Sequence, residues 1–296
     1  MIEVQLNVSS EEVEQLEALF CESLQQNWLL FRKNAKSQPS LRGYFESEGE
    51  AKDALAELKQ EVRSLQTDSF EILPVDEQDW KMAYRHHLKP WKKGRLNWVP
   101  VWEKETFSIE PDQVYVYLDS GMAFGTGSHE TTRLCAEALY GFVEGKNPNH
   151  SINVMDAGCG SGVLAMSASR LGFESVYAFD RDPEAVKVTV ENLEFNGMTG
   201  VVEVLEAGIE EGVKDRQAHI IMANIQADVL MIYVDELVKS WNPDGGIMIL
   251  SGILAVEVEQ VKEVFAAKLA EIFENTHFTA AVEQMGEWVS LVFEAD

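Results

Sequence analysis

The first 74 residues alternate between the hydrophobic period of a strand and that of a helix. Residues 2–8 alternate apolar and polar side chains, as a half-buried strand does, and Ser9 and Glu12 have the spacing of a capping box at a helix start. Further strands are expected at 28–31, 41–45 and 70–74, and a second helix at 51–64. The order βαββαβ predicts a small α+β, ferredoxin-like domain over residues 1–74. Because this fold serves many functions, it indicates only a binding or recognition module.

Beyond Pro111 the pattern changes to apolar runs that alternate with amphipathic helices. The runs lie at 152–157, 175–180, 201–205, 219–224, 246–251, 279–285 and 287–293. Strands with continuous apolar runs are buried on both faces, as in parallel sheets. Only Gly286 separates the last two runs, so they are expected to be an antiparallel pair at the sheet edge. The pattern predicts an α/β domain with a mostly parallel seven-stranded sheet over residues 96–296.

Residues 75–95 are expected to join the two domains. The pattern is helical to about residue 88 and is ended by Pro90 and Gly94. No Asp or Glu falls between Trp80 and Trp102, whereas six basic residues do: Lys81, Arg85, Lys89, Lys92, Lys93 and Arg95. Interleaved tryptophans give this stretch a superficial likeness to a nucleic-acid surface. Aromatic anchors that pack a linker against two domains are the simpler explanation.

Charge argues against a polyanion as partner. The 296 residues include 50 Asp and Glu against 24 Lys and Arg, a net charge of −26, and residues 111–296 hold 30 of the acidic and 10 of the basic residues. Affinity for nucleic acid comes mostly from Lys and Arg, so no direct nucleic-acid partner is expected. No apolar run reaches the ~20 residues of a membrane span, and the N-terminus lacks the regions of a signal peptide, so we expect a cytoplasmic protein without membrane contact.

The cysteines and histidines indicate neither a disulfide framework nor a metal site. Cys21, Cys135 and Cys159 are odd in number and far apart, and the histidines lack a carboxylate or cysteine at ligand spacing. Cys159 has no neighbouring base and is interpreted as a small loop filler. No metal is expected.

The strongest local signal is a glycine-rich turn that follows an apolar strand. Asp156 ends the strand, and Gly158, Gly160 and Gly162 alternate with other residues before a helix. Such glycines let the backbone approach a ligand closely. A dinucleotide fingerprint places its third glycine one residue later, and an acid at Asp156 would repel a diphosphate but tolerate a cationic sulfonium. The spacing therefore favours S-adenosylmethionine over NAD.

A second acid follows the next predicted strand. Asp180 lies 22 residues past Gly158, where a carboxylate is placed to accept both ribose hydroxyls of a nucleoside. The alternative role, capping the helix that begins at Pro183, fits Asp182. Both roles are compatible because two acids are available.

A third segment, Leu118–Thr132, contains three glycines in seven positions, with Thr, Ser and His interleaved. It resembles a signature loop of bacterial methyltransferases that modify large-subunit ribosomal protein L11, the PrmA family. The same family resemblance extends over residues 76–296 through four further segments: Asp79-Trp80, Asp156–Gly162, Ala223-Asn224-Ile225 and Leu250–Leu254. The N-terminal module is similar in the order of its elements much more than in its residues.

The resemblance implies a Rossmann-like, S-adenosylmethionine-dependent protein methyltransferase that transfers methyl groups to lysine ε-amines of ribosomal protein L11, with the N-terminal α-amine as a further target. It implies S-adenosylmethionine as cofactor and a substrate-recognition role for residues 1–74. The implied donor-binding residues are Phe124, Gly125, Thr126, Thr132, Gly158, Gly160, Asp180 and Asn224.

Three positions depart from the family pattern. Ser120 stands where proline is usual, Glu130 where proline is frequent, and Gln226 where leucine is usual. Glu130 and Gln226 are expected near the entrance of the target amine, so they bear on substrate identity more than on reaction type.

Asn224 is the expected catalytic residue. Its side-chain oxygen is placed to accept a hydrogen bond from the amine, together with the carbonyl of Ile225, and so to aim the nitrogen lone pair at the methyl group; the alternative is a turn residue that ends a strand. His129 is interpreted as a structural residue rather than a proton relay. Two other functions stay open: a related methyltransferase for another protein, RNA or small molecule, and a donor-binding assembly factor without catalysis.

Overall fold

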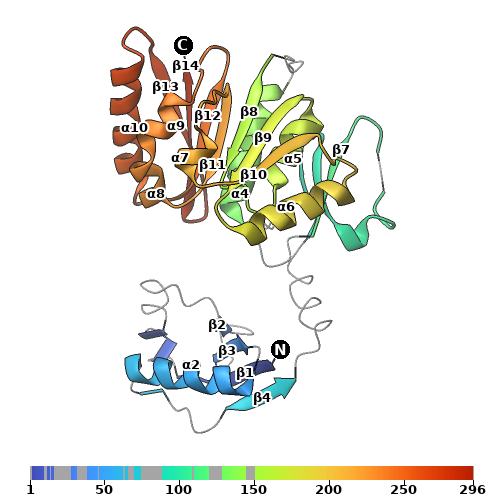
Figure 1. Cartoon of the computed structure of the whole chain (residues 1–296), viewed down its shortest axis with the longest axis vertical. Helices are drawn as coiled ribbons and strands as arrows, with labels where there is room; N and C mark the ends of the chain where they lie inside the picture. Colours follow the sequence, from blue (N-terminus) through green and yellow to red (C-terminus); the bar gives the residue numbers. More distant parts are fainter. Residues whose placement is uncertain are drawn as a thin grey trace. The chain divides into compact units, whose positions relative to one another are not determined.

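The computed structural model describes residues 2–9, 12–13, 15–16, 28–31, 39–45, 47–62, 64–65, 70–74, 89–108, 110–119, 129–144 and 151–295. The chain divides into two compact units, with the boundary between Arg85 and His86. The first unit contains β1–β4 and α2, and the second contains the elements from β5 onward (Figure 1). The predicted joint helix at 75–88 lies outside the described residues.

The first unit is built on a four-stranded antiparallel sheet. Its strands are β1 (Ile2–Asn7), β2 (Trp28–Phe31), β3 (Ser40–Phe45) and β4 (Glu71–Pro74), in the order β2-β3-β1-β4. Helix α2 (Glu48–Glu61) packs Leu55 and Leu58 into its core. The predicted capping box is present: the Glu12 N–H donates to Ser9 Oγ at 3.2 Å, and the Ser9 N–H donates to Glu12 Oε2 at 2.6 Å. This small antiparallel sheet with its helix confirms the predicted α+β module.

The second unit contains the seven-stranded sheet. Its strands are β8 (Asn153–Ala157), β9 (Ser175–Asp180), β10 (Val202–Glu206), β11 (Ile220–Asn224), β12 (Ile247–Leu254), β13 (Phe278–Met285) and β14 (Trp288–Ala295). The order is β10-β9-β8-β11-β12-β14-β13; the first five strands are parallel, and β14 is antiparallel to both neighbours. The mostly parallel sheet and the antiparallel pair at its edge are confirmed.

Helices cover both faces of this sheet, which explains why its strands are apolar throughout (Figure 1). On one face lie α4 (Glu130–Val143), α5 (Val163–Leu171) and α6 (Pro183–Phe195). On the other lie α7 (Ile209–Gly212), α8 (Ala227–Ile232), α9 (Val234–Lys239) and α10 (Val258–Ile272). Alternate residues of β11 enter the two cores: Ile220 and Met222 join one, and Ile221 and Ala223 the other.

A three-stranded sheet, which the sequence pattern did not predict, precedes α4. It contains β5 (Trp91–Lys93), β6 (Leu96–Pro100) and β7 (Val114–Leu118). A 3-10 turn, η2 (Val101–Glu103), follows β6 directly along the chain. The pairing of β6 with β7 is parallel and joins segments 18 residues apart in register, Leu96 with Val114. Residues 91–93, predicted as part of the joint, thus form a strand of the second unit.

Within the described ranges, no helix is long and apolar enough to cross a membrane. The same ranges hold no group of three or more His, Cys, Asp or Glu side chains arranged to hold a metal ion.

Candidate active site

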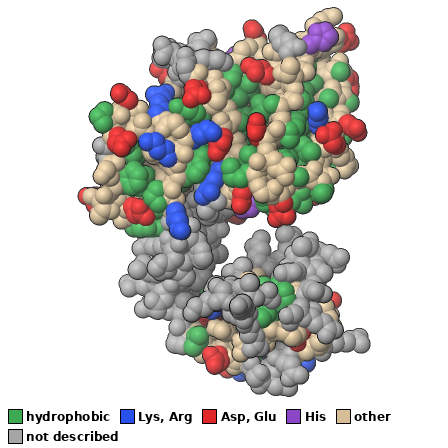
Figure 2. All heavy atoms as spheres, turned by 180° about the vertical axis from the view of Figure 1, so that it is seen from behind, with side chains coloured by type: hydrophobic (Ala, Val, Ile, Leu, Met, Phe, Trp, Pro, Cys, Tyr) green, Lys and Arg blue, Asp and Glu red, His purple; other side chains and the backbone are tan. Residues whose placement is uncertain are grey.

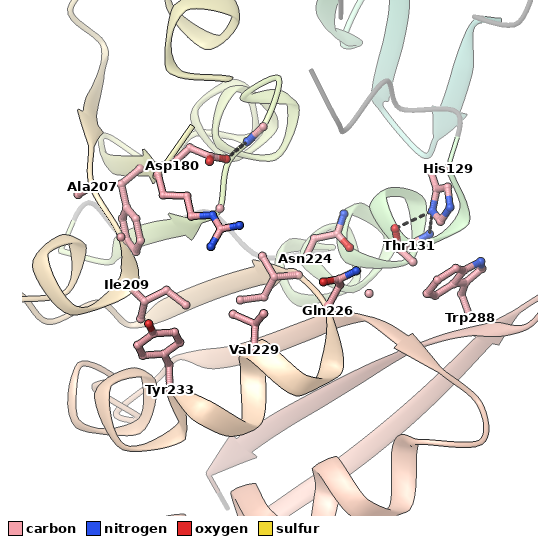
Figure 3. Close-up of a pocket in the computed structure, with 17 residues that line it drawn as sticks. His129, Thr131, Asp180, Ala207, Ile209, Asn224, Gln226, Val229, Tyr233 and Trp288 are labelled. Carbon is pink, nitrogen blue, oxygen red and sulfur yellow. Dashed lines mark hydrogen bonds between the residues drawn. The ribbon is translucent and has the colours of Figure 1, made fainter. Parts of the chain in front are cut away.

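A cavity of about 440 Å³ lies at the carboxyl edge of the parallel strands. Its lining comes from the carboxyl ends of all five parallel strands, with Gly252 from β12, and from the start of α4, from α8 and from the start of β14 (Figure 3). In the sheet, β8 and β11 are neighbours. The chain continues from β8 to β9 on one side of this pair and from β11 to β12 on the other side. Open α/β sheets bind ligands at this kind of switch point. The cavity is therefore the first candidate for a functional site.

The glycine-rich turn after β8 forms one wall of the cavity. Gly158, Gly160 and Gly162 all have positive φ, at 75°, 54° and 75°. A β-carbon at Gly158 would come within 2.6 Å of Cγ2 of Ile225, so a side chain is excluded by sterics as well as by φ. Thr189 on α6 donates its hydroxyl to the Gly160 carbonyl at 2.8 Å and braces the turn from behind. The backbone is thus exposed to a ligand and held in place.

Asp180 ends β9 and lines the cavity beside this turn. Its Oδ2 accepts a hydrogen bond from the Gly160 N–H at 2.9 Å, and its Oδ1 accepts one from the Asp182 N–H at 3.0 Å. These two bonds orient the carboxylate and leave further lone pairs on both oxygens for a ligand. Asp182 is the N-cap of α6 and accepts from the Glu184 N–H at 2.9 Å. The two adjacent acids therefore have the two separate roles that the sequence suggested.

Asp156 does not face the cavity, which changes the charge argument made from sequence. Its side chain is buried, and its Oδ2 accepts a hydrogen bond from the Ala165 N–H at 2.9 Å, at the start of α5. Burial raises the pKa of the Asp156 carboxyl to about 7; the Ala165 bond opposes this rise and the Asp180 charge adds to it. Asp156 supports the turn, and of these two acids only Asp180 lines the cavity.

Asn224 lies at the end of β11 with its carboxamide turned to the cavity (Figure 3). Its Nδ2 donates to Thr132 Oγ1 at 3.2 Å. Among the described residues its Oδ1 is one of few buried polar atoms with no hydrogen-bond partner. Since buried polar groups are normally paired, an oriented and unpartnered carbonyl oxygen points to a donor on a ligand. A residue that only ends a strand would not need a side-chain oxygen that is held in place and left without a partner.

Thr132 and His129 belong to the start of α4. Thr132 is buried behind Asn224 and does not line the cavity itself. His129 is the N-cap of α4: its Nδ1 accepts from the Thr131 N–H at 3.4 Å and lies 2.8 Å from Thr131 Oγ1. Its ring also packs against that of Trp288, with centroids 5.2 Å apart. These contacts support the structural interpretation of His129.

The structure brings together four of the expected donor-binding residues, Gly158, Gly160, Asp180 and Asn224, with Thr132 directly behind them. Phe124, Gly125, Thr126 and the departure at Ser120 lie outside the described residues. Of the other two departures, Gln226 lines the cavity and Glu130 does not. Sequence reasoning missed several lining residues: Arg181, Ala207, Ile209, Val229, Tyr233 and Trp288. In the sequence these residues have only one feature in common: each lies within two residues of an end of a strand or helix.

Cys159 packs within the turn as expected. It is buried, its sulfur lies 3.5 Å from Thr189 Oγ1, and burial raises the pKa of its thiol. A thiol held protonated in this way is not a nucleophile.

Within the described part of the basic stretch, Lys92, Lys93 and Arg95 all have partners. Lys92 and Lys93 pair with Glu110 and Glu137, at 3.6 and 2.8 Å, and Arg95 Nη2 donates to the Leu171 carbonyl at 2.9 Å. The rings of Trp91 and Trp98 pack with centroids 4.3 Å apart, and Trp98 is buried. Figure 2 shows Lys and Arg gathered at one side of this face of the second unit, with acidic side chains among them. This arrangement favours packing over nucleic-acid binding.

Three features define the Rossmann-like methyltransferase fold: a mostly parallel sheet with one antiparallel strand near its edge, a glycine-rich turn after β8, which is the middle one of the five parallel strands, and an acid that ends β9. The structural comparison agrees. A crystal structure from Lactobacillus delbrueckii subsp. bulgaricus, described as a ribosomal protein L11 methylase, superposes with a TM-score of 0.58 at 28% identity, covering 69% of this chain and 96% of that one.

The family model described as "Ribosomal protein L11 methyltransferase (PrmA)" matches residues 3–296, and the chain belongs to this family. A Pelobacter propionicus protein named ribosomal protein L11 methyltransferase is 40% identical over 225 residues, which are 75% of this chain and 68% of that one. Proteins of the same name from Exiguobacterium sp. and Clostridium perfringens are 32% and 35% identical, each over 85% of this chain and 78% of the relative. The resemblance stated from the sequence is confirmed.

Proposed function

We propose that this protein transfers methyl groups from S-adenosylmethionine to lysine ε-amines of ribosomal protein L11, with the N-terminal α-amine as a further target. The observation that carries the proposal is the buried, unpartnered Oδ1 of Asn224 in the cavity that the glycine turn and Asp180 also line. Family membership and the printed names of the relatives support L11 as the protein substrate.

The residues present fit the donor. The positive-φ turn at Gly158 and Gly160 leaves no β-carbon between backbone and ligand, and Asp180 offers an oriented carboxylate to vicinal hydroxyls. Carboxylate charge beside the cavity also favours a sulfonium over a phosphate. When bound, S-adenosylmethionine supplies an electrophilic methyl group on positively charged sulfur. Gly158, Gly160, Asp180 and Asn224 would hold it, with Thr132 fixing the Asn224 carboxamide.

The residues of this protein bind the lysine amine of the substrate, orient it and remove it from water. A lysine amine with a pKa near ~10.4 is mostly charged at neutral pH, and a buried site favours its neutral, nucleophilic form. Asn224 Oδ1 accepts an N–H of this amine, which directs the lone pair along a defined line. The Trp288 ring and Ile225 line the same cavity and present apolar surface to a bound amine, which lowers its contact with water.

Charge supports modification of the free L11 protein in the cytoplasm, before ribosome assembly. Residues 111–296 carry 30 acidic and 10 basic side chains. An acidic body attracts a basic protein by long-range electrostatics, but ribosomal RNA around the same target would repel it. We therefore infer that L11 bound in the ribosome is the poorer substrate.

The test is incubation with labelled S-adenosylmethionine and purified L11, free or within ribosomes, followed by mass mapping of the modified amines. Free L11 should gain label at lysines, and faster than L11 in ribosomes. Label in another lysate component but none in L11 would retire the substrate, and label at no amine would retire the reaction.

Asn224→Ala supplies the mechanistic arm of the same experiment. Loss of the amine acceptor should lower kcat about a hundredfold, since misplacing a reacting group by ~1 Å has effects of this size. Asn275→Ala, the same change in an exposed turn at the opposite edge of the sheet, should leave kcat unchanged. A fully active Asn224→Ala would contradict the catalytic role; donor binding without transfer by the parent protein would favour a non-catalytic assembly factor.

A further inference from the structure

Among the described residues that line the cavity, Gln226 is the one side-chain carboxamide besides Asn224, and the donor-binding arrangement does not use it. It lines the cavity two residues after Asn224, and Figure 3 shows its carboxamide pointing toward Asn224 on the side where Trp288 lies. Although Gln226 is the N-cap residue of α8, its side chain makes no cap hydrogen bond. The carboxamide of Gln226 makes no other hydrogen bond to the described residues. The group is therefore available to a ligand.

The described residues next to Gln226 on the Trp288 side of the cavity are either apolar or already in contact with other protein groups. Trp288 packs its ring against His129, and the His129 ring nitrogen Nδ1 is engaged by Thr131. Ile225 and Val229 present hydrocarbon. An amine that has reached Asn224 Oδ1 thus meets one further side-chain carboxamide, that of Gln226, on its way out of the cavity.

The number of N–H groups on the amine decides what this carboxamide contributes. A neutral primary amine has two N–H donors and one lone pair. In each transfer the lone pair forms the N–C bond while the C–S bond of the donor breaks and its electrons remain on sulfur. After the first and the second transfer the new ammonium releases one proton to solvent, whereas the third transfer gives a quaternary ammonium that has no proton to release. The first two cycles therefore each replace one N–H by a methyl group, and a dimethylamine has no donor left for either carboxamide. A methyl group placed against an amide oxygen also deprives that oxygen of water without replacing the hydrogen bond.

We propose that Gln226 makes this site discriminate between amines by their number of N–H groups, so that unmethylated amines react best and dimethylated amines worst. This inference rests on the proposed transfer to amines. The carboxamide oxygen is the discriminating atom, because it accepts an N–H from the unmethylated amine and faces a methyl group in the dimethylated one.

The experiment compares purified unmodified L11 with L11 whose lysines have been dimethylated by reductive alkylation. For each protein kcat/KM is measured with labelled S-adenosylmethionine, and mass spectrometry gives the mono-, di- and trimethyl products. The quantity of interest is the ratio of kcat/KM for unmodified over dimethylated L11. In Gln226→Leu, which removes both polar atoms and shortens the side chain by one atom, this ratio should fall about tenfold, as expected for one hydrogen bond between uncharged groups. Trimethyl product should appear earlier.

Two further variants separate the carboxamide oxygen from other effects. Gln226→Glu retains an acceptor oxygen at the same reach and should preserve the high ratio. Gln217→Leu, the same substitution at an exposed position before β11 and hence at the opposite edge of the sheet, should leave the ratio unchanged. Calorimetric donor affinity, measured for every variant, reports an intact site.

An unchanged ratio in Gln226→Leu, with normal donor affinity, would overturn the role of Gln226 while leaving amine methylation standing. An equal fall in Gln226→Glu would overturn the acceptor oxygen as the discriminating atom. Absence of transfer by the parent protein to either form of L11 would instead overturn the proposed function, and this inference with it.

Discussion

At the scale of single residues, the site divides its acids into three different tasks. Asp180 faces the cavity, Asp182 caps α6, and Asp156 is buried under the glycine turn. The sequence already suggested separate roles for Asp180 and Asp182, but it placed the charge of Asp156 at the ligand, where the structure does not have it. Their surroundings separate them: two backbone N–H groups orient Asp180, whereas Asp156 is removed from water and receives one.

The division between Asp180 and Asp182 is testable by calorimetry. In Asp180→Ala the Kd for S-adenosylmethionine should rise ten- to a hundredfold, about the effect of losing a charge-assisted hydrogen bond of ~1.5–3 kcal/mol. In Asp182→Ala, two residues along, the Kd should stay the same and the free energy of unfolding should fall by ~1 kcal/mol through loss of the cap. Equal donor affinities of parent and Asp180→Ala would contradict the ribose assignment.

Asp156 leads to a prediction about stability and pH. Folding raises the pKa of this carboxyl from 3.8 to about 7, mainly by burial. Below pH 3.8 the Asp156 carboxyl is neutral in both the folded and the unfolded state, so its burial does not lower the free energy of unfolding. As the pH rises from 3.8 to about 7, the unfolded state loses its proton first, and the free energy of unfolding falls. This decrease is complete above pH ~7.

The variant Asp156→Asn removes this titration and keeps an oxygen that can accept the Ala165 N–H. Its gain in unfolding free energy over the parent should be larger at about pH 8 than at about pH 5, by ~2–3 kcal/mol. Denaturant melts at the two pH values measure it. The exposed Asp244→Asn is the control and should show no such difference. A gain independent of pH would mean that Asp156 is charged in the folded protein across this range.

At the scale of elements, the turn between β8 and α5 shows how backbone geometry makes a binding surface. Three alternate glycines adopt positive φ, and α6 secures the turn through Thr189 and through Asn192, whose Nδ2 donates to the Ser161 carbonyl at 3.0 Å. Gly252 does the same on the neighbouring side: it interrupts the β12–β14 register with φ of 81°, and a β-carbon there would overlap the Ile225 carbonyl. These elements approach each other closely because glycine is at the contact.

Gly158→Ala should weaken donor binding for two separable reasons. The added β-carbon meets Cγ2 of Ile225 at 2.6 Å, and alanine at φ +75° is strained by ~1–2 kcal/mol. Calorimetry on Gly158→Ala, on Ile225→Ala and on the double variant separates the two. The double variant should recover the steric part of the affinity and retain the loss from φ. Full recovery would show that φ at this position is unimportant.

The sequence pattern was reliable for elements whose burial is complete or regularly alternating. The run 175–180 predicts β9 to the residue, and β8, β10 and β11 begin one residue later than predicted. Helix α2 begins at Glu48, three residues before the predicted start, because Ser47 caps it. The β5–β6–β7 sheet was missed because β6 pairs in parallel with a segment separated from it by a turn and a loop, and no local period reports such a pairing.

At the scale of the whole molecule, the two units have separate hydrophobic cores. Residues of β1, β3 and α2 build one core, and the two faces of the seven-stranded sheet build the others. All described residues that line the cavity come from residue 129 onward. We therefore expect donor binding in the second unit, and recognition of the protein substrate is the function we propose for residues 1–74.

Deleting residues 1–74 tests this modularity. Calorimetry should show unchanged affinity for S-adenosylmethionine, because no cavity residue is removed. Methylation of L11 should be lost, which a mass measurement of L11 after incubation would reveal. If the shortened protein modified L11 as fast as the parent, the small unit would not be the recognition module.

The sequence by itself determined the local chemistry: where strands end, which glycines follow, and that Asp180 and Asn224 stand at strand ends. These features depend on residues close together in the chain, through burial period, φ preference and capping. Only the tertiary structure decided which of them share a space. Strand order brings β8 beside β11. The packing of α4 unites Asn224 with Thr132, the position of β14 places Trp288 in the cavity that Gln226 lines, and α5 covers Asp156. Such convergence depends on pairings between distant segments, which a pattern of near neighbours does not encode.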